Sequence, residues 1–88
     1  MNSDALYNKI YPIQPKQAYR TYNSDTRVHD VTYRAYDMLV ICTVDWYKTY
    51  KVEVFKKNPY TAMDRRIGTV YGDKAKAIYD RALRTCGR

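Results

Sequence analysis

A chain of 88 residues can bury one hydrophobic core and has little room for a second, so we expect a single domain over 1–88. Apolar residues make up 45% and aromatic residues 15% of the chain, which excludes a disordered segment. Sixteen Lys and Arg against nine Asp and Glu give a formal net charge of +7, which excludes a protein that imitates DNA, because such a protein must be acidic.

The segment up to Pro12 predicts a short helix. Ser3 or Asp4 can serve as its N-cap, because a short polar side chain accepts hydrogen bonds from the free N–H groups of a first helical turn. Leu6 and Ile10 are four residues apart, so they lie on one helical face that can pack on a core. Pro12 cannot continue a helix and marks its end.

The next segment, QPKQAYRTYN at 14–23, predicts a second short helical piece. Pro15 suits the first position of a helix, where its missing N–H has no intrahelical partner to lose. In such a helix Tyr19 and Tyr22 share a face. Residues 1–26 as a whole are therefore expected to be loosely structured or to form short helices, before a sheet and a C-terminal helix over 27–88.

After this segment the hydrophobic pattern changes to a period of two, which is typical of β-strands. Alternation of apolar and polar residues predicts strands at 27–36 and at 50–57. Between them lies an apolar run at 38–46, which should be the central strand. A short final strand is predicted at 66–72. The pattern thus predicts an antiparallel sheet of three or four strands.

The strongest local pattern is DKAKAIYDRALRTCG at 73–87, with Asp73 as the N-cap and Gly87 as the C-terminal stop. At about 100° per residue one side of this helix is apolar and the opposite side is basic. The basic side carries Lys74, Arg81, Arg84 and Arg88. An amphipathic C-terminal helix that packs on one face of the sheet and shows a basic stripe to water gives an α+β fold in two layers.

A Tyr–cation–any–Tyr pattern occurs three times, at 19–22, 33–36 and 47–50, and each copy begins fourteen residues after the one before. The flanking residues differ, so a duplicated module is not indicated. One interpretation is architectural, because tyrosine suits the ends of strands and the interval equals one strand plus one turn. The other is functional: rings stack on unpaired bases, cations neutralise phosphates, and both residue types are enriched at protein interfaces.

The residues predicted to contact a partner are aromatic or basic, and they come from the second and third tyrosine copies, two basic pairs and the basic stripe. They are Tyr33, Arg34, Tyr36, Tyr47, Lys48, Tyr50, Lys56, Lys57, Arg65, Arg66, Lys74, Arg81, Arg84 and Arg88. The cations would steer the chain toward an anionic partner, and the tyrosines would supply contact area. The alternative interpretation of the charge is solubility, because small domains often carry a net charge of up to about 8.

No set of residues suggests catalysis, a metal site or a cofactor, so we expect a protein that is not an enzyme. His29 and Asp30 are neighbours in a predicted strand and would point to opposite faces. One histidine with Cys42 and Cys86 falls short of a zinc site, and whether the two thiols pair stays open. The N-terminus lacks an apolar signal core and no stretch approaches the ~18 apolar residues of a membrane span, so a cytoplasmic location without membrane contact is expected.

In size, α+β layout, skewed charge and lack of catalytic residues, the chain resembles the small inhibitors that bacteriophages direct at host defence, such as anti-CRISPR proteins. The resemblance rests on no motif and transfers no residue role. It implies a phage or mobile-element protein that inhibits a nucleic-acid-handling complex in the host cytoplasm by contacting its protein, its guide RNA or DNA. The alternative is a stand-alone DNA- or RNA-binding protein. A subunit of a homo-oligomer is a third interpretation, and the oligomeric state stays open.

Overall fold

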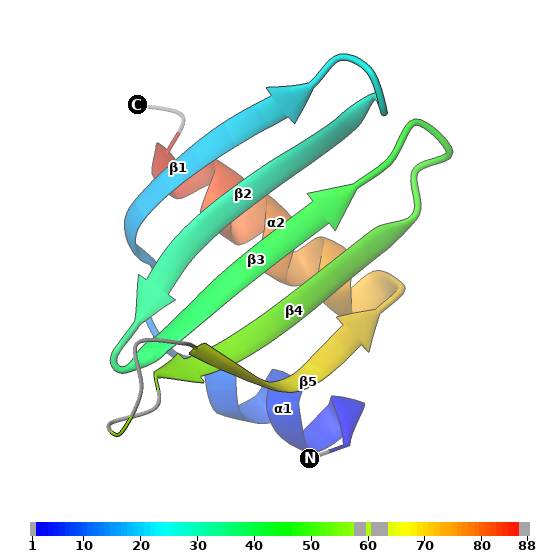
Figure 1. Cartoon of the computed structure of the whole chain (residues 1–88). Helices are drawn as coiled ribbons and strands as arrows, with labels where there is room; N and C mark the ends of the chain where they lie inside the picture. The colour runs from blue at the N-terminus through cyan, green and yellow to red at the C-terminus, as the bar shows by residue number, and fades with distance from the viewer. Residues whose placement is uncertain (1, 58–59, 61–63, 87–88) are drawn as a thin grey trace.

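The fold is one antiparallel sheet with two helices on the same side (Figure 1). The computed structural model describes residues 2–57, 60 and 64–86. Over these residues the elements are α1 (Ser3–Ile10), β1 (Lys16–Asn23), β2 (Val28–Ala35), β3 (Met38–Val44), β4 (Tyr50–Lys57), β5 (Asp64–Tyr71) and α2 (Asp73–Cys86). Each strand pairs with the next one along the chain. The α+β class is confirmed, but the described part of the sheet has five strands where three or four are predicted.

The additional strand is β1, in the segment that the sequence pattern assigns to a helix. That assignment is wrong, because the segment pairs with β2 from Tyr19 opposite Thr32 to Asn23 opposite Val28. Tyr and Thr favour strands, and the ladder satisfies their backbone groups. β1 is an edge strand whose side chains are almost all exposed, so it lacks the alternation that reveals a half-buried strand. The positive φ of Gln17, 54°, lies where the register shifts.

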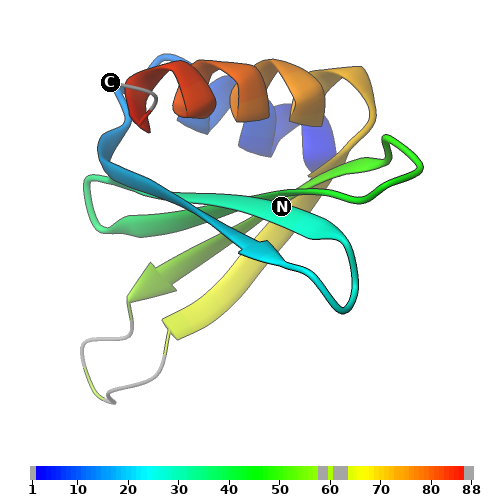
Figure 2. The ribbon, with the colours of Figure 1, turned by 90° about the horizontal axis from the view of Figure 1, so that it is seen from above.

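Both helices cover one face of the sheet, and the other face has no helix on it (Figure 2). α2 packs across all the strands, while α1 packs against β5. Leu6 and Ile10 of α1 are fully buried, as their spacing predicts, and they join the same core as the valines of the strands. The apolar side of α2 closes this core through Ala75, Ile78 and Ala82.

The ends of the helices and strands differ from the predicted ones by small shifts. The N-cap of α1 is Asn2 rather than Ser3 or Asp4, since its side-chain oxygen accepts a hydrogen bond from the Ala5 N–H at 2.8 Å. The strand predicted at 66–72 is present as β5, and it begins two residues earlier. Gly72 then turns the chain into α2 with a φ of +75°, a conformation that glycine adopts without steric cost.

Candidate functional site

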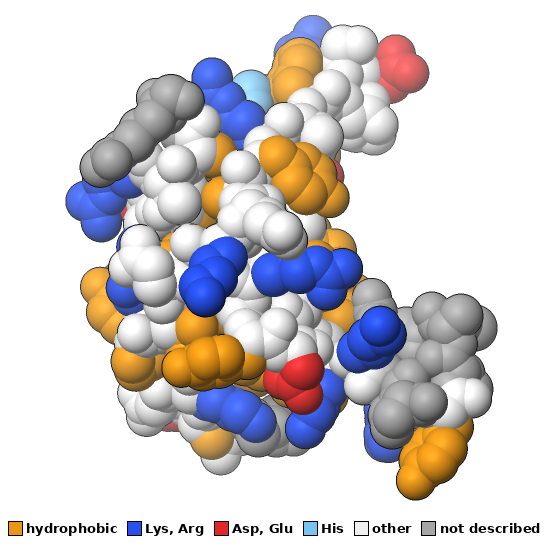
Figure 3. All heavy atoms as spheres, turned by 90° about the vertical axis from the view of Figure 1, so that its left-hand side faces the viewer, with side chains coloured by type: hydrophobic (Ala, Val, Ile, Leu, Met, Phe, Trp, Pro, Cys, Tyr) orange, Lys and Arg blue, Asp and Glu red, His pale blue; other side chains and the backbone are white. Residues whose placement is uncertain are grey.

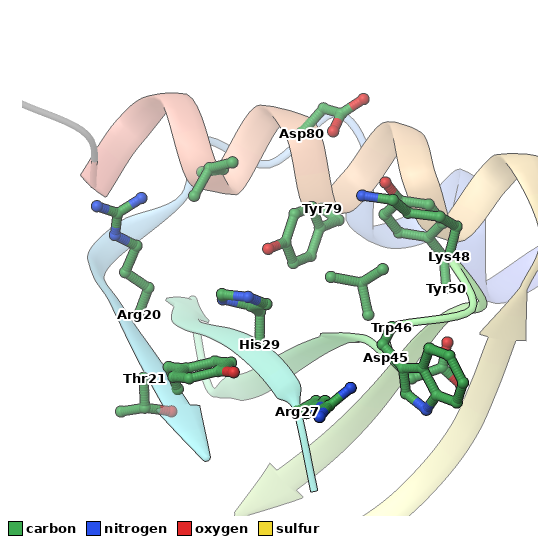
Figure 4. Close-up of a pocket in the computed structure, with 13 residues that line it drawn as sticks. Arg20, Thr21, Arg27, His29, Asp45, Trp46, Lys48, Tyr50, Tyr79 and Asp80 are labelled. Atoms are coloured by element: carbon green, nitrogen blue, oxygen red, sulfur yellow. The ribbon is translucent and has the colours of Figure 1, made fainter. Parts of the chain in front are cut away.

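A hollow in the described part of the surface lies between α2 and the two hairpins at one end of the sheet (Figure 4). Strands twist relative to one another, so the ends of the β1–β2 and β3–β4 hairpins diverge from a straight helix packed across the sheet. The space left has a volume of about 840 Å³. We call it the aromatic groove. It is lined by Arg20, Thr21, Tyr22, Arg27, His29, Val44, Asp45, Trp46, Lys48, Tyr50, Tyr79, Asp80 and Leu83.

Aromatic rings and charged side chains line the groove in equal numbers. Tyr22 and His29 are opposite each other on β1 and β2, and their ring centroids are 4.3 Å apart. On the floor of the groove, Tyr79 of α2 and Tyr50 pack edge to face, with ring centroids 5.4 Å apart. Tyr22 and Trp46 are 55% and 56% exposed, so a part of each ring faces solvent and is free to stack on a ligand.

Three cations surround these rings without an ion pair among the described residues. Arg20, Arg27 and Lys48 are all exposed, and Figure 4 shows Arg20 at the β1 side of the groove and Lys48 at the β3–β4 side. The two carboxylates of the groove have other partners. Asp80 pairs with the Lys76 ammonium at 3.3 Å, and Asp45 accepts hydrogen bonds from its own turn. The N–H groups that bind Asp45 are neutral and leave its charge in place, so three unpaired cations and one carboxylate give the groove a net positive charge.

The turn between β3 and β4 fixes the position of Lys48. The side-chain oxygen of Asp45 accepts hydrogen bonds from the N–H groups of Tyr47 and Thr49 at 2.9 and 3.0 Å, and the Asp45 carbonyl accepts one from the Lys48 N–H at 3.0 Å. These bonds hold Lys48 in the left-handed region at a φ of 67°. The backbone of this cation is thus set by the turn before any ligand arrives.

The three tyrosine copies do not form one surface. The first copy supplies Arg20 and Tyr22 to the groove, and the third supplies Lys48 and Tyr50. The second copy lies at the far end of the strands, where β2 turns into β3 (Figure 1). The second and third copies bracket β3 at its two turns, which agrees with the architectural interpretation of the spacing. The groove nevertheless uses two of the three copies for one site.

Tyr33 is wrongly predicted as a contact residue, because it is only 2% exposed and belongs to the core. On β2 it alternates with Arg34, which points to the helix-free face and is exposed. Burial raises the pKa of the Tyr33 hydroxyl well above its ordinary value, with a smaller rise from Cys42 that the charge of Arg81 opposes. Tyr36 is 82% exposed in the β2–β3 turn, far along the sheet from the groove.

The basic stripe of α2 is largely engaged by the N-terminal segment. Lys74 pairs with Asp4 and lies 5.5 Å from the centre of the Tyr7 ring. Arg81 donates to the Tyr11 carbonyl and lies 5.3 Å from the centre of the Tyr11 ring. These contacts hold the N-terminal segment against α2, so the two cations are not free to bind a partner as predicted.

The remaining members of the basic stripe are placed differently. Arg84 is exposed and lines a small hollow beside Gln14 and Arg81, away from the aromatic groove. Arg88 lies outside the described residues. The stripe is therefore not a continuous cationic surface over the part of α2 that the structure describes.

The two basic pairs lie at the opposite end of the sheet from the groove, where β4 ends and β5 begins (Figure 1). They are Lys56, Lys57, Arg65 and Arg66. Lys56 pairs with Asp37 at 3.8 Å, and Arg66 pairs with Glu53 at 3.3 Å. Figure 3 shows Lys and Arg side chains in several separate places on the β1 side of the molecule. The predicted contact residues thus do not form one surface, and among those that the structure describes Lys48 and Tyr50 are the two that line the groove.

Most residues of the groove are absent from the predicted set. The missed aromatic and basic ones are Arg20, Tyr22, Arg27, His29, Trp46 and Tyr79. A signal for Arg20 and Tyr22 is present in the first tyrosine copy, since alternate residues of a strand share a face. Arg27 and Trp46 carry no such signal, because they lie in the turns between strands, where alternation does not indicate which way a side chain points.

The described residues also bear on the expectations for a metal site, for the two thiols and for a membrane span. They contain no group of three or more His, Cys, Asp or Glu side chains arranged to hold a metal ion. Cys42 and Cys86 are free thiols. Burial, with a smaller effect of the Asp30 charge, raises the pKa of Cys42 to about 12. None of the helices in this part of the chain is long and apolar enough to cross a membrane.

Comparison of the chain with protein-family models finds no match. The same comparison with curated proteins and with solved structures also finds none. Function is therefore inferred from the geometry of the groove.

Proposed function

We propose that this chain is a non-enzymatic protein that binds single-stranded nucleic acid in the aromatic groove. The observation that carries the proposal is the arrangement of three exposed, unpaired cations, Arg20, Arg27 and Lys48, around partly exposed rings. Cations neutralise phosphates, and each base that stacks on an aromatic ring contributes about 1–3 kcal/mol. Nucleic acid needs both features at once, and the groove offers both within one hollow.

A single strand fits this arrangement better than a duplex. The partly exposed rings of Tyr22 and Trp46 line a hollow between α2 and the hairpins, and the ring of Tyr79 at its floor is buried. In a duplex the faces of the bases are stacked on one another and cannot reach such rings without being unstacked. In a single strand they are available, and stacking on aromatic rings tolerates every base. Binding with little sequence preference is therefore expected.

The test is a binding titration by fluorescence anisotropy with labelled oligothymidylate, oligouridylate and a duplex of equal length, at 50 and 200 mM salt. If three phosphates are neutralised, the affinity for a single strand should fall about 18-fold over this range, since log K changes with log salt by about −0.7 per phosphate. The double variant Arg20→Gln, Arg27→Gln should bind more weakly and show a shallower salt dependence. Arg84→Gln is the matched control, because Arg84 is an exposed cation outside the groove. Absence of single-strand binding at 50 mM salt would refute the proposal.

A second candidate function is inhibition of a nucleic-acid-handling complex by a phage or mobile-element protein in the host cytoplasm, as in the anti-CRISPR-like interpretation of the sequence. The observation that favours it is the exposure of large rings outside the groove, with Tyr36 at 82% and Tyr47 at 70%. Exposed tyrosines are typical of residues that dominate protein interfaces. A pull-down from host lysate tests it: a protein retained after nuclease treatment supports direct contact, and retention that depends on nucleic acid supports the first function.

A further inference from the structure

The aromatic groove does not end at the β3–β4 turn. A second hollow, with a volume of about 540 Å³, lies on the other side of that turn and reaches the junction of β5 and α2. Lys48 and Tyr50 line both hollows. The two spaces therefore adjoin across these side chains, and a chain-like ligand in the first hollow has a direct continuation into the second.

The second hollow adds an exposed ring but no further unpaired cation, and its lining includes the exposed carboxylate of Asp73. Tyr71, the last residue of β5, lines it and is 63% exposed. Gly72 has no atom within 4 Å of the place where a Cβ would stand, so the backbone there is open to an approaching ligand. Lys76 also lines this hollow, but its ammonium pairs with Asp80 at 3.3 Å. Of the two cations that line this hollow, Lys48 is therefore the one without an ion pair among the described residues.

This order of groups matches the order of groups along a nucleic-acid strand. Rings and the cations Arg20 and Arg27 occupy the first hollow, Lys48 stands at the junction, and Tyr71 follows beyond it. A polynucleotide alternates flat bases with charged phosphates, so one phosphate at Lys48 would place bases on either side of the junction. A mononucleotide could fill only one of the two hollows.

We infer that the ligand of this site is a continuous single strand of about four nucleotides or more, which passes over Lys48 and stacks a base on Tyr71. The inference rests on the proposed function and specifies the length and the path of its ligand. A length of about four nucleotides is the lower end of the range for small single-strand-binding domains.

The experiment compares the Tyr71→Ala variant with the unmodified protein on labelled oligothymidylates of two, four, six and eight nucleotides. Loss of one stacked base should weaken binding of the six- and eight-nucleotide strands about 5-fold or more, while binding of the dinucleotide changes less than twofold. Tyr19→Ala is the matched control, because Tyr19 is a comparably exposed tyrosine of the sheet, 56% exposed, that lines neither hollow. It should leave the affinity at every length unchanged.

A second measurement uses Trp46, the one tryptophan of the sequence, which lines the first hollow. Oligothymidylate should quench its fluorescence to the same extent in the protein and in Tyr71→Ala, since that variant changes only the far end of the path. If Tyr71→Ala binds all lengths as the unmodified protein does while Arg20→Ala binds them more weakly, the extended path is wrong and the proposed function stands. If no oligonucleotide binds or quenches Trp46, the proposed function itself fails.

Discussion

Tyr22 on β1 and His29 on the adjacent strand β2 are a cross-strand pair, with ring centroids 4.3 Å apart and ring planes inclined by 32°. The pair stands on the wall of the aromatic groove, where Tyr22 keeps 55% of its surface exposed. A ring supported from behind by a second ring loses little freedom when a ligand stacks on its other face. Tyr22 is therefore expected to be one of the residues on which binding depends most.

The first prediction concerns this residue. Tyr22→Ala should weaken the binding of a single strand about 5-fold or more, because one stacking platform is removed. It should lower the free energy of unfolding by only about 1 kcal/mol or less, since a cross-strand pair at an exposed edge contributes about that much. Anisotropy titration and urea denaturation measure the two quantities. An unchanged affinity in a folded variant would exclude Tyr22 from the site.

The second prediction separates charge from stability at Lys48. Its φ of 67° is unfavourable for a residue with a side chain and neutral for glycine. Lys48→Gly should therefore remove one phosphate contact while the free energy of unfolding changes by less than about 1 kcal/mol, since relief of strain offsets the larger entropy of the unfolded chain.

Salt titration of the Lys48→Gly variant tests that the lost contact is ionic. The slope of log K against log salt should become shallower by about 0.7, the value for one phosphate on a single strand. Lys9→Gln is the control for a cation outside the groove. Glutamine is used there because glycine would weaken the helix α1, which contains Lys9. A Lys48→Gly variant with the slope of the unmodified protein would show that Lys48 does not contact a phosphate.

The elements with a strong hydrophobic period could be predicted from the sequence, and β1 could not. α2 and the strands from β2 to β4 each bury alternate or helically spaced apolar residues, which is the signal that periodicity detects. β1 buries almost nothing, and its conformation is decided by pairing with β2. Local propensity is weaker than such tertiary pairing, so the helix expected at 14–23 does not form.

The site was harder to predict than the fold for a related reason. Arg20 and His29 lie nine residues apart in sequence, and both lie far from Tyr79, which faces them from α2 (Figure 4). They meet because β1 pairs with β2 and α2 packs on both strands, a property of the assembled layers rather than of any segment. Tyrosine content and net charge indicate the type of contact, but they cannot indicate which tyrosines face the core, as Tyr33 does.

The third prediction concerns Arg81, which was expected to bind a partner and instead contacts the N-terminal segment. It donates to the Tyr11 carbonyl, and its second nitrogen lies 3.5 Å from the side-chain oxygen of Gln14. Arg81→Ala should lower the free energy of unfolding by about 1 kcal/mol, since charged hydrogen bonds at an exposed site are partly screened. Its affinity for a single strand should change less than twofold. A large loss of affinity without loss of stability would show that Arg81 contacts the nucleic acid.

The fourth prediction is a loss of stability in alkali. Burial raises the pKa of the Tyr33 and Tyr79 hydroxyls above the ordinary value of 10.0, and it raises that of the Cys42 thiol from 9.0 to about 12. The folded protein therefore holds these protons more tightly than the unfolded chain does. Their stabilising effect is complete below about pH 9 and is lost as the pH rises above the ordinary values, by up to about 1.4 kcal/mol per pH unit for each group.

Urea denaturation at pH values from 8 to 11 measures this dependence, and Tyr33→Phe isolates one contributor. The variant keeps the buried ring and lacks the titrating hydroxyl, so its stability should fall less steeply above pH 10. Tyr36→Phe is the control, because it removes the hydroxyl of a tyrosine that is 82% exposed. Equal slopes for Tyr33→Phe and the unmodified protein would mean that Tyr33 ionises as readily in the folded chain as in the unfolded one. That outcome would contradict the burial of Tyr33, which is 2% exposed in the core.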